Sequence, residues 1–581
     1  MLMQNSGRIA HKLHDNILGG KTMKRSISIR WSAIVCSVIA LLLILGIHYL
    51  AQPAWSLAHD GFWWFVFGSF AVLSVFAIIE AVRSEYQDRE NSFTMIHYAI
   101  WIITGVLLVW MGIGAFISSP AVAADTYKNT VTIEEGDFNE DFADLINEEN
   151  YVFMDLDTAQ RLGDRVLGSV PNATWYEIDK EYNLIIYQGR SYRISPLNYG
   201  GLFKYGKAEA VGLPGYVLVD CETGLAKFVE TKEPMKYSPS AYFGTNLKRF
   251  LRGRYPDKVF NSHFFEIDEE GNPYWVTTIS EKQAGVWGAR KVTSFILTNA
   301  ITGDSELYSL DKKPDWLDHT VSLEYMMQVA GWNYRYVNGW WNPSNTGVLK
   351  TTYSYAKAQS SSDKENVEPN FYGYNCFVNA KGEVLIFTGV TPVNKIESNV
   401  GFLTINAATG EYRYYNISGA EESSAQTVVE GLIQNMGYQA TFPFMVNVAG
   451  HPTYLMNMKD KSGLIQRYAM VNLENYSQAF VGNTFEDTLN GYLEQIGETA
   501  KTVPVEIETP ETTLEASGVI LEKYQAELDG TTVFYYIIDD ELYRASLKIN
   551  ESQILFKAGN TVELKYVVNN NINVVVEIDM K

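Results

Sequence analysis

The residues best suited to hold a ligand lie in one aromatic segment, AGWNYRYVNGWWNPSN, at positions 330–345. Indole and phenol rings beside amide side chains can stack on sugar rings or anchor a partner protein. The alternation of the first three aromatics also fits a strand that faces a core, with the two adjacent tryptophans under the next loop, and this interpretation is preferred. The candidate binding residues are Trp332, Tyr334, Tyr336, Trp340 and Trp341.

Side chains that commonly perform catalysis do not gather in a recognisable pattern. Outside the apolar N-terminal region, the histidines His263, His319 and His451 each stand alone in the sequence. No zinc-binding spacing, nucleophile elbow or phosphate-binding loop occurs. We therefore predict no catalytic residues, no metal and no cofactor. Carboxylates are numerous, so a hydrolase that uses an Asp/Glu pair remains an alternative.

One acidic stretch imitates a calcium-binding loop. EEGDFNEDFADLINEEN (134–150) places Asp137, Asn139, Asp141 and Glu148 at the spacing of calcium ligands. The sixth position of such a loop needs glycine for a sharp turn, and Phe142 occupies it. We therefore interpret residues 119–150 as a solvated acidic linker.

Charge and cysteine content exclude further classes. Residues after 118 contain 38 Lys/Arg and 61 Asp/Glu, a net charge of −23 that repels phosphate backbones, so no nucleic acid is expected. The three cysteines make no disulfide framework or metal cluster, because Cys36 lies in an apolar run and Cys221 and Cys376 are far apart. A single bond between the last two stays open.

The first 118 residues are typical of a membrane anchor. Three apolar runs, at 31–50, 62–82 and 96–118, are each long enough to cross the bilayer as a helix. Basic residues precede the first run and are missing from the loop after it, which predicts a cytoplasmic basic N-terminus, residues 1–30, and an extracytoplasmic location for everything after 118. Two questions stay open: cleavage after residue 123 or 124, and a start at Met23 in place of Met1.

A short turn recurs along the rest of the chain. Three apolar runs end in Asp or Asn, two residues, then Thr-Gly. The Asp or Asn side chain can bond its own backbone two residues on, and Gly accepts the positive φ of a hairpin. The turn residues have a structural role and join two strands: Asp220, Thr223 and Gly224; Asn299, Thr302 and Gly303; Asn406, Thr409 and Gly410.

Helical patterns precede the strands that flank these turns. DTAQRLGDRVLG places Asp157 and Gln160 in capping-box spacing, and SSAQTVVEGLIQNMG repeats the arrangement with Ser423 and Gln426. VNLENYSQAF (471–480) resembles a fourth turn that lacks Thr-Gly. The pattern predicts tandem units, each a helix on a small antiparallel sheet, whose neighbours stack because each core is modest.

The C-terminal part differs from these units. A Pro/Thr/Glu-rich linker at 499–513 precedes about five strand-like runs with no helical pattern, at 514–581. Strand number and length predict a small all-β barrel of the OB type. The expected modules are 151–235, 236–312, 313–418 with an insertion, and a degenerate 419–498.

A helix followed by a sheet that closes on hydrophobic-Asp-x-x-Thr-Gly resembles the PepSY domain. The stretches 334–355 and 397–473 are similar to a group of membrane-anchored proteins of Gram-positive bacteria that carry several PepSY-like modules. The resemblance implies an α+β tandem array outside the membrane that binds or restrains other envelope proteins, peptidases among them. It supplies no catalytic residues.

The preferred functional prediction is therefore an extracytoplasmic protein-binding or regulatory protein of the cell membrane, with residues 31–118 in the bilayer. The first alternative is a cell-wall glycan binder that uses the aromatics between 332 and 341. The second is the carboxylate-dependent hydrolase.

Overall fold

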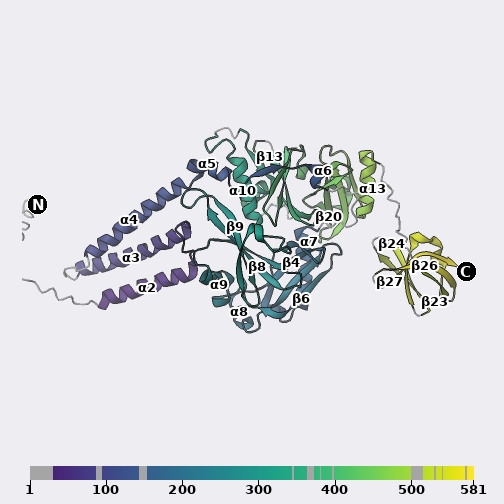
Figure 1. Cartoon of the computed structure of the whole chain (residues 1–581), viewed down its shortest axis with the longest axis horizontal. Helices are drawn as coiled ribbons and strands as arrows, with labels where there is room; N and C mark the ends of the chain where they lie inside the picture. The colour runs from purple at the N-terminus through teal and green to yellow at the C-terminus, as the bar shows by residue number, and fades with distance from the viewer. Residues whose placement is uncertain are drawn as a thin grey trace, which may run out of the picture. The chain divides into compact units, whose positions relative to one another are not determined.

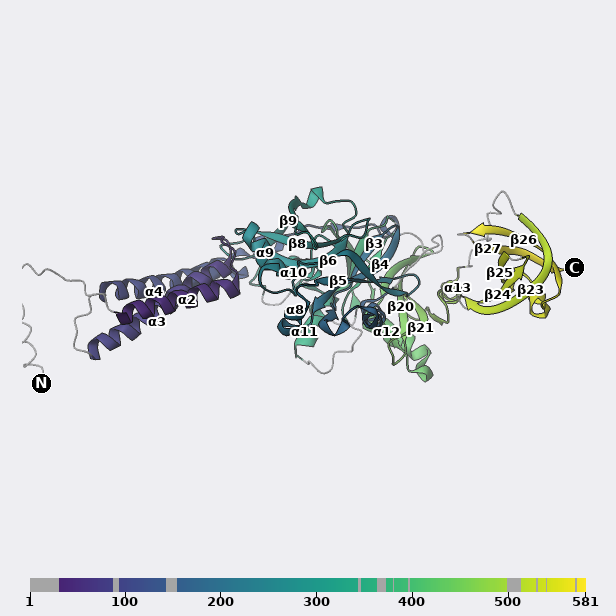
Figure 2. The ribbon, with the colours of Figure 1, turned by 90° about the horizontal axis from the view of Figure 1, so that it is seen from below.

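The computed structural model describes residues 31–86, 94–142, 154–342, 346–362, 372–379, 381–394, 398–498, 514–528, 531–539, 541–569 and 572–581. Contacts divide the chain into two units, whose elements are drawn in Figure 1 and Figure 2. One unit holds residues up to Val122 together with Leu251–Val259 and Gly285–Gly288, and the other holds the remainder. All the described strands belong to the second unit.

Three long helices dominate the first unit: α2 (Trp31–Ala51), α3 (Asp60–Tyr86) and α4 (Thr94–Ile117). Each carries an apolar run of 18 to 22 residues, enough to cross the hydrocarbon of a bilayer. Ser74 and Thr104 share a hydrogen bond of 2.9 Å between α3 and α4. In length and composition, these helices confirm the predicted membrane spans.

Short segments from the later chain join this unit. The backbone N–H of Trp55, in the loop between α2 and α3, donates to the carbonyl of Pro256 at 2.8 Å. The Ser118 hydroxyl, just after α4, accepts from the backbone N–H groups of Val286 and Trp287 at 2.8 and 2.9 Å. Helices α5 (Pro120–Lys128) and α9 (Leu247–Arg254) run from one unit into the other.

The second unit begins with two antiparallel sheets. The first has the order β2-β4-β5-β6, with β3 also paired to β4, and the second has the order β10-β9-β8-β7. Helices α7 (Leu156–Asp164) and α8 (Leu202–Ala208) accompany the first sheet. The strands are β2 (Tyr176–Ile178), β3 (Asn183–Tyr187), β4 (Arg190–Tyr199), β5 (Leu213–Asp220), β6 (Ala226–Met235), β7 (Phe260–Ile267), β8 (Pro273–Lys282), β9 (Arg290–Asn299) and β10 (Ser305–Ser309).

The third sheet is six-stranded and includes a strand from far upstream. Its order is β1-β16-β15-β13-β11, with β12 also on β13, and β1 pairs parallel to β16. Helices α10 (Leu323–Arg335) and α11 (Thr352–Ser362) accompany it. The strands are β1 (Ile133–Glu135), β11 (Leu349–Thr351), β12 (Asn375–Val378), β13 (Val384–Pro392), β15 (Gly401–Asn406) and β16 (Tyr412–Tyr415), and β14 (Ser398–Asn399) pairs separately with β17 (Gly419–Ala420).

The fourth sheet has the order β18-β20-β21-β22, with β19 also on β20, and helices α12 (Glu422–Leu432) and α13 (Phe485–Ile496). Its strands are β18 (Gln439–Ala440), β19 (Phe444–Val448), β20 (His451–Lys459), β21 (Ile465–Asn472) and β22 (Ala479–Gly482).

Strand β13 explains how the sheets share their cores. Its residues are buried on both faces: Leu385 and Phe387 pack with the fourth sheet, whereas Ile386 packs with residues of the first sheet and of α10. A strand with both faces covered is apolar throughout, because successive side chains point to opposite sides. Two cores are thus shared: one between the third and fourth sheets, and one that includes residues of the first and third sheets.

The recurring turn has the same geometry each time. A side-chain oxygen of Asp220, Asn299 or Asn406 accepts two backbone N–H groups, two and three residues on, at 2.9 to 3.0 Å. The glycine of each turn has a φ between +69° and +78°. Asn472 accepts from Glu474 and Asn475 at 2.9 and 3.1 Å in the same way, so it opens the fourth, divergent turn.

Three local predictions are wrong. Helix α7 is capped by Asp155, whose carboxylate accepts from the Thr158 N–H, and not by Asp157. Helix α12 begins one residue before Ser423 and has no side-chain cap. Part of the stretch predicted to be a solvated linker is structural, because β1 joins the third sheet and Phe138, on α6 (Phe138–Asp141), is buried with Phe142.

The C-terminal residues form a closed barrel of five strands in the order β23-β24-β25-β27-β26, and β26 pairs back to β23. Strands β25 and β27 are parallel, and the other pairs are antiparallel. Two short 3-10 helices, Leu547–Ile549 and Glu551–Leu555, separate β25 from β26, so the expected lack of helix in this part of the chain is wrong. The strands are β23 (Leu514–Leu528), β24 (Thr531–Ile538), β25 (Glu541–Ser546), β26 (Thr561–Asn569) and β27 (Ile572–Met580).

Candidate functional site

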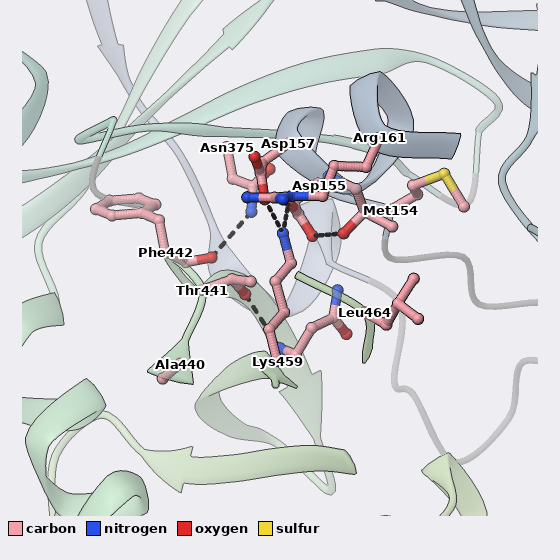
Figure 3. Close-up of polar contacts among 12 residues, drawn as sticks. Met154, Asp155, Asp157, Arg161, Asn375, Ala440, Thr441, Phe442, Lys459 and Leu464 are labelled. Carbon is pink, nitrogen blue, oxygen red and sulfur yellow. Dashed lines mark hydrogen bonds and ion pairs between the residues drawn. The ribbon is translucent and has the colours of Figure 1, made fainter. Parts of the chain in front are cut away.

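A buried lysine joins the first sheet's helix to the fourth sheet. The side chain of Lys459, the last residue of β20, is 1% exposed. Its Nζ lies 2.5 Å from an oxygen of Asp155 and 3.0 Å from an oxygen of Asp157, both at the start of α7 (Figure 3). A buried ammonium needs such partners, because an unpaired charge away from water is costly. Residues about 300 positions apart are thereby fixed together.

Arg161 completes this junction at its rim. Its Nε donates to Asp157 at 3.0 Å, and its guanidinium also donates to the carbonyl of Ser462 at 3.4 Å. Burial by itself raises the pKa of Asp157, but the hydrogen bonds and charges of Arg161 and Lys459 outweigh it, and the net shift is downward. Asp157 is therefore a stable carboxylate, not a proton donor.

A small cavity of about 20 Å³ lies beside the junction. It is lined from three sheets, by Asp155, Arg193, Tyr374, Cys376 and Phe442 among others. This volume suits about one water molecule and is too small for a substrate.

Arg193, on β4, is 4% exposed and donates to the carbonyls of Met154 and Tyr182 at 3.1 to 3.3 Å. Both neighbouring cysteines are free thiols. Burial raises the pKa of Cys376, and it raises that of Cys221 to about 12, so neither is a reactive thiolate.

A second cluster of charged residues joins the first two sheets. Glu266, on β7, is fully buried, and neither carboxyl oxygen has a hydrogen-bond partner among the described residues. Burial and the neighbouring Asp318 raise its pKa well above the usual range. Burial also raises the pKa of Asp318 to about 7, although that carboxylate accepts from the Ile186 N–H at 2.6 Å. Burial lowers the pKa of His319, which contacts the Leu184 carbonyl, to about 4.

A third buried carboxyl, Glu422 at the start of α12, lies between the third and fourth sheets. It accepts from the Thr352 hydroxyl at 3.2 Å and from the Asn399 amide at 3.1 Å. Burial raises its pKa. These three clusters place ionisable groups at the contacts between sheets, where Glu266 and Glu422 are fully buried and Asp155 is 8% exposed.

An open groove of about 430 Å³ lies on the barrel between β23, β26 and β27. Its lining is mostly acidic, and its one lysine, Lys565, pairs with Glu577 at 2.7 Å. A solvated surface groove of this kind does not by itself indicate a chemical function.

The five predicted aromatic residues do not form one surface. Their preferred assignment to a strand is wrong, because Trp332 and Tyr334 lie on helix α10, which ends just before Tyr336. Tyr334 and Tyr336 are buried, and the Trp332 ring packs edge-on against Tyr127 of α5 at 4.8 Å.

Trp340 and Trp341 differ from the other three. They are 44% and 78% exposed, and their rings meet edge to face at 4.4 Å. Asn338 and Asn342, which flank the pair, donate from their amides to the Thr346 carbonyl at 2.6 and 2.8 Å. The two rings are therefore exposed side by side.

The other residues singled out in the sequence have local roles. Asp137 caps α6, and Asp141 pairs with Arg413 and accepts from the Tyr415 hydroxyl at 2.9 Å. Glu148 lies outside the described residues. Within the described ranges, no group of His, Cys, Asp and Glu has the arrangement of a metal site.

Sequence reasoning missed Lys459, Glu266 and Glu422. A signal was available for two of them: a charged residue inside or at the end of an apolar run, as in HPTYLMNMK for Lys459 and NSHFFEI for Glu266. Such a residue is either at a strand end in water or buried against a partner, and the partner cannot be located without the fold.

The described residues form three helices that are long and apolar enough to span a membrane, four larger β-sheets and a closed β-barrel. No family model matches the chain, and no curated protein matches it. Among solved structures, it is similar to a GH32 β-fructofuranosidase of Bombyx mori, solved as a mutant with sucrose, at 10% identity over 72% of this chain and 69% of that one. The TM-score of 0.16 is too low for this likeness to carry an argument about fold or function.

Proposed function

We propose that this chain is a membrane-anchored extracytoplasmic protein that binds another protein of the cell envelope and scaffolds or restrains it. The basic residues ahead of α2 support a cytoplasmic N-terminus, with the sheets and barrel outside. PepSY-like modules belong to this proposal, which the shared turn and the helices beside the first, third and fourth sheets support. The strand order of the barrel supports an OB-like assignment, in a fold that hosts many binding functions.

The observation that carries the proposal is the exposed pair Trp340 and Trp341. Tryptophan is enriched among the residues that dominate protein–protein binding, because it buries a large rigid surface at low entropic cost. Here both rings are exposed and contact each other edge to face, so together they offer one apolar contact surface.

The rigid body behind this loop also supports a scaffold. The ion pairs of Lys459 and the hydrogen bonds of Glu422 connect sheets, and two of the cores are shared between sheets. A partner held at one point would therefore be held at a fixed position relative to the whole array.

A cell-wall glycan is the second candidate ligand. Sugar sites combine a flat exposed ring with nearby polar groups for the hydroxyls. Only two of the five aromatics are exposed, their rings are nearly perpendicular at 88°, and both neighbouring amides already bond to Thr346. These features favour a protein partner over a sugar.

The test is crosslinking in cells followed by purification of the tagged full-length chain. We expect one reproducible protein partner with wild type, and about tenfold less of it with Trp340→Ala/Trp341→Ala, the loss of an aromatic hot spot. The matched control is Leu432→Ala/Met436→Ala on and after α12, where the side chains are similarly exposed at 56% and 40%. Equal recovery by the tryptophan variant, or repeated absence of any partner, would count against the proposal.

The glycan alternative has its own measurement. If wild type sediments with purified peptidoglycan and only the tryptophan variant does not, the function of the chain is glycan binding. Sedimentation that is equal in wild type and variant would remove that candidate.

A further inference from the structure

A strongly basic segment interrupts an otherwise acidic chain. Between Leu247 and Lys258, the sequence LKRFLRGRYPDK holds five basic residues and one acidic residue, whereas residues after 118 carry a net charge of −23. Lys248 and Arg254 are exposed on α9. Such a local reversal of sign requires an explanation beyond solubility, because the rest of the surface is already well charged.

The position of this segment supplies the explanation. Residues Leu251–Val259 belong to the same compact unit as the three membrane helices. The link is the backbone hydrogen bond from Trp55 to Pro256, at 2.8 Å. Trp55 lies in the loop that connects two spans, so Pro256 stands at the level where the chain leaves the bilayer.

Aromatic residues mark that level independently. The Trp55 ring lies 5.6 Å from the His48 ring at the end of α2 and 5.9 Å from the Phe62 ring at the start of α3. Trp63 and Trp110 meet at 5.7 Å between α3 and α4. Tryptophan and its aromatic neighbours concentrate at the headgroup region of membranes, so this end of the helices is interfacial.

The loop after α9 is held in shape by one of its own arginines. The Arg252 guanidinium donates to the carbonyls of Tyr255, Pro256 and Lys258 at 3.3, 3.1 and 2.6 Å. Arg252 thereby positions the loop. Lys248 and Arg254, on the helix before it, project their charge from an ordered support and not from a mobile tail.

We propose that the basic segment 248–258 binds the headgroups of anionic phospholipids beside the spans. Ammonium and guanidinium groups pair with lipid phosphates, and clusters of them next to a membrane helix favour anionic over zwitterionic lipid. The acidic remainder of the chain is repelled from the same surface. The segment thus enriches anionic lipid around the three spans. It also holds the adjoining part of the chain at the membrane surface.

The test uses the full chain in nanodiscs that contain equal amounts of phosphatidylglycerol and phosphatidylcholine. A photoreactive benzoyl-phenylalanine replaces Gly253, on α9, where an added side chain meets nothing within 4 Å. The matched control replaces Gly431, a second exposed helical glycine with open space around it, on α12. Mass spectrometry then identifies the adducts.

We expect lipid adducts at position 253 with several-fold more phosphatidylglycerol than phosphatidylcholine, and none at position 431. The exposed double variant Lys248→Glu/Arg254→Glu should abolish that preference. Lys227→Glu/Lys232→Glu, which changes the same charge on strand β6, should keep it. Protein adducts or no adducts at 253, an adduct ratio equal to the bilayer ratio, or a preference that survives Lys248→Glu/Arg254→Glu would overturn the proposal.

Discussion

Two buried clusters of charged residues hold the sheets together in opposite ways. At the Lys459 junction, one ammonium meets two carboxylates, and every charge has a partner. At the Glu266 cluster, burial and the nearby Asp318 raise the pKa of Glu266, whose carboxyl has no hydrogen-bond partner in the described part of the chain. Opposite charges thus meet in the first cluster, whereas in the second the neutral form of Glu266 is favoured.

The difference shows two ways in which a chain offsets the free-energy cost of removing a charged group from water. Pairing favours the ionised form when the counter-charge lies within hydrogen-bond distance, as Arg161 and Lys459 do for Asp157, whose pKa is lowered on balance. Without such a partner, the pKa of the group shifts until the group is neutral, as for Glu266. The two junctions should therefore respond oppositely to loss of a partner and to pH.

Removing the lysine should have the largest effect. Lys459→Ala leaves Asp155 and Asp157 close together without their buried counter-charge, so we expect a loss of about 3–5 kcal/mol of stability. Hydrogen exchange should rise first in α7 and at the β20–β21 hairpin, and thermal melting should report the total. The matched control is Lys565→Ala, whose exposed pair with Glu577 should affect stability far less, because water and salt screen it. If both variants lose the same free energy of unfolding, the buried junction stabilises the fold no more than an exposed ion pair does.

The Glu266 cluster should reveal itself through pH. A carboxyl whose pKa is raised on folding takes up a proton, so its stabilisation is full below the unfolded pKa and is lost as pH rises through the folded pKa. Wild type should therefore lose up to about 1.4 kcal/mol per pH unit for each such group above about pH 4.5. Glu266→Gln keeps the shape of the side chain but cannot titrate. It should therefore reduce the slope of the free energy of unfolding against pH, including above pH 7, when denaturation is measured at a series of pH values. A slope unchanged by the variant would contradict the neutral carboxyl.

The sequence predicted the parts of this fold that depend on neighbours along the chain. Apolar runs locate the three spans, and the Asn/Asp and Gly positions of the turn at Asn406 match the observed hydrogen bonds because a turn is closed within five residues. The five-stranded barrel also follows from strand number. The PepSY-like relationship stays a prediction.

Long-range partners could not be predicted. Lys459 ends an apolar strand, and only the fold brings it to Asp155, about 300 residues away. The alternation in WNYRYV fits a strand, yet tertiary packing of Tyr334 and its neighbours against the third sheet makes it helical. β1 likewise pairs across a gap of more than 270 residues, so its segment looked like a linker.

Asp318 should change the stability of the fold by less than Glu266, and over a narrower range of pH. Burial raises its pKa to about 7, Lys313 opposes that shift and Glu269 adds to it, and the Ile186 N–H favours the ionised form. Its stabilisation is complete near pH 4 and is lost by about pH 7, with no further change above. Asp318→Asn, which can still accept from Ile186, should flatten the stability profile only between about pH 4 and 7. An effect that extends well above pH 7 would assign the titration to Glu266 instead.

The rim of the first junction should give the smallest effect. Arg161 shares Asp157 with Lys459, but its side chain is 43% exposed, so water competes for the pair. Arg161→Ala should cost about 0.5–1 kcal/mol, several-fold less than Lys459→Ala, and the cost should shrink in high salt. Arg161→Met, which keeps the packing of the aliphatic stem, separates charge from packing at this position. If the two arginine variants destabilise the chain equally and without salt dependence, the charge on Arg161 contributes nothing, and the ionic character of the junction belongs to Lys459 alone.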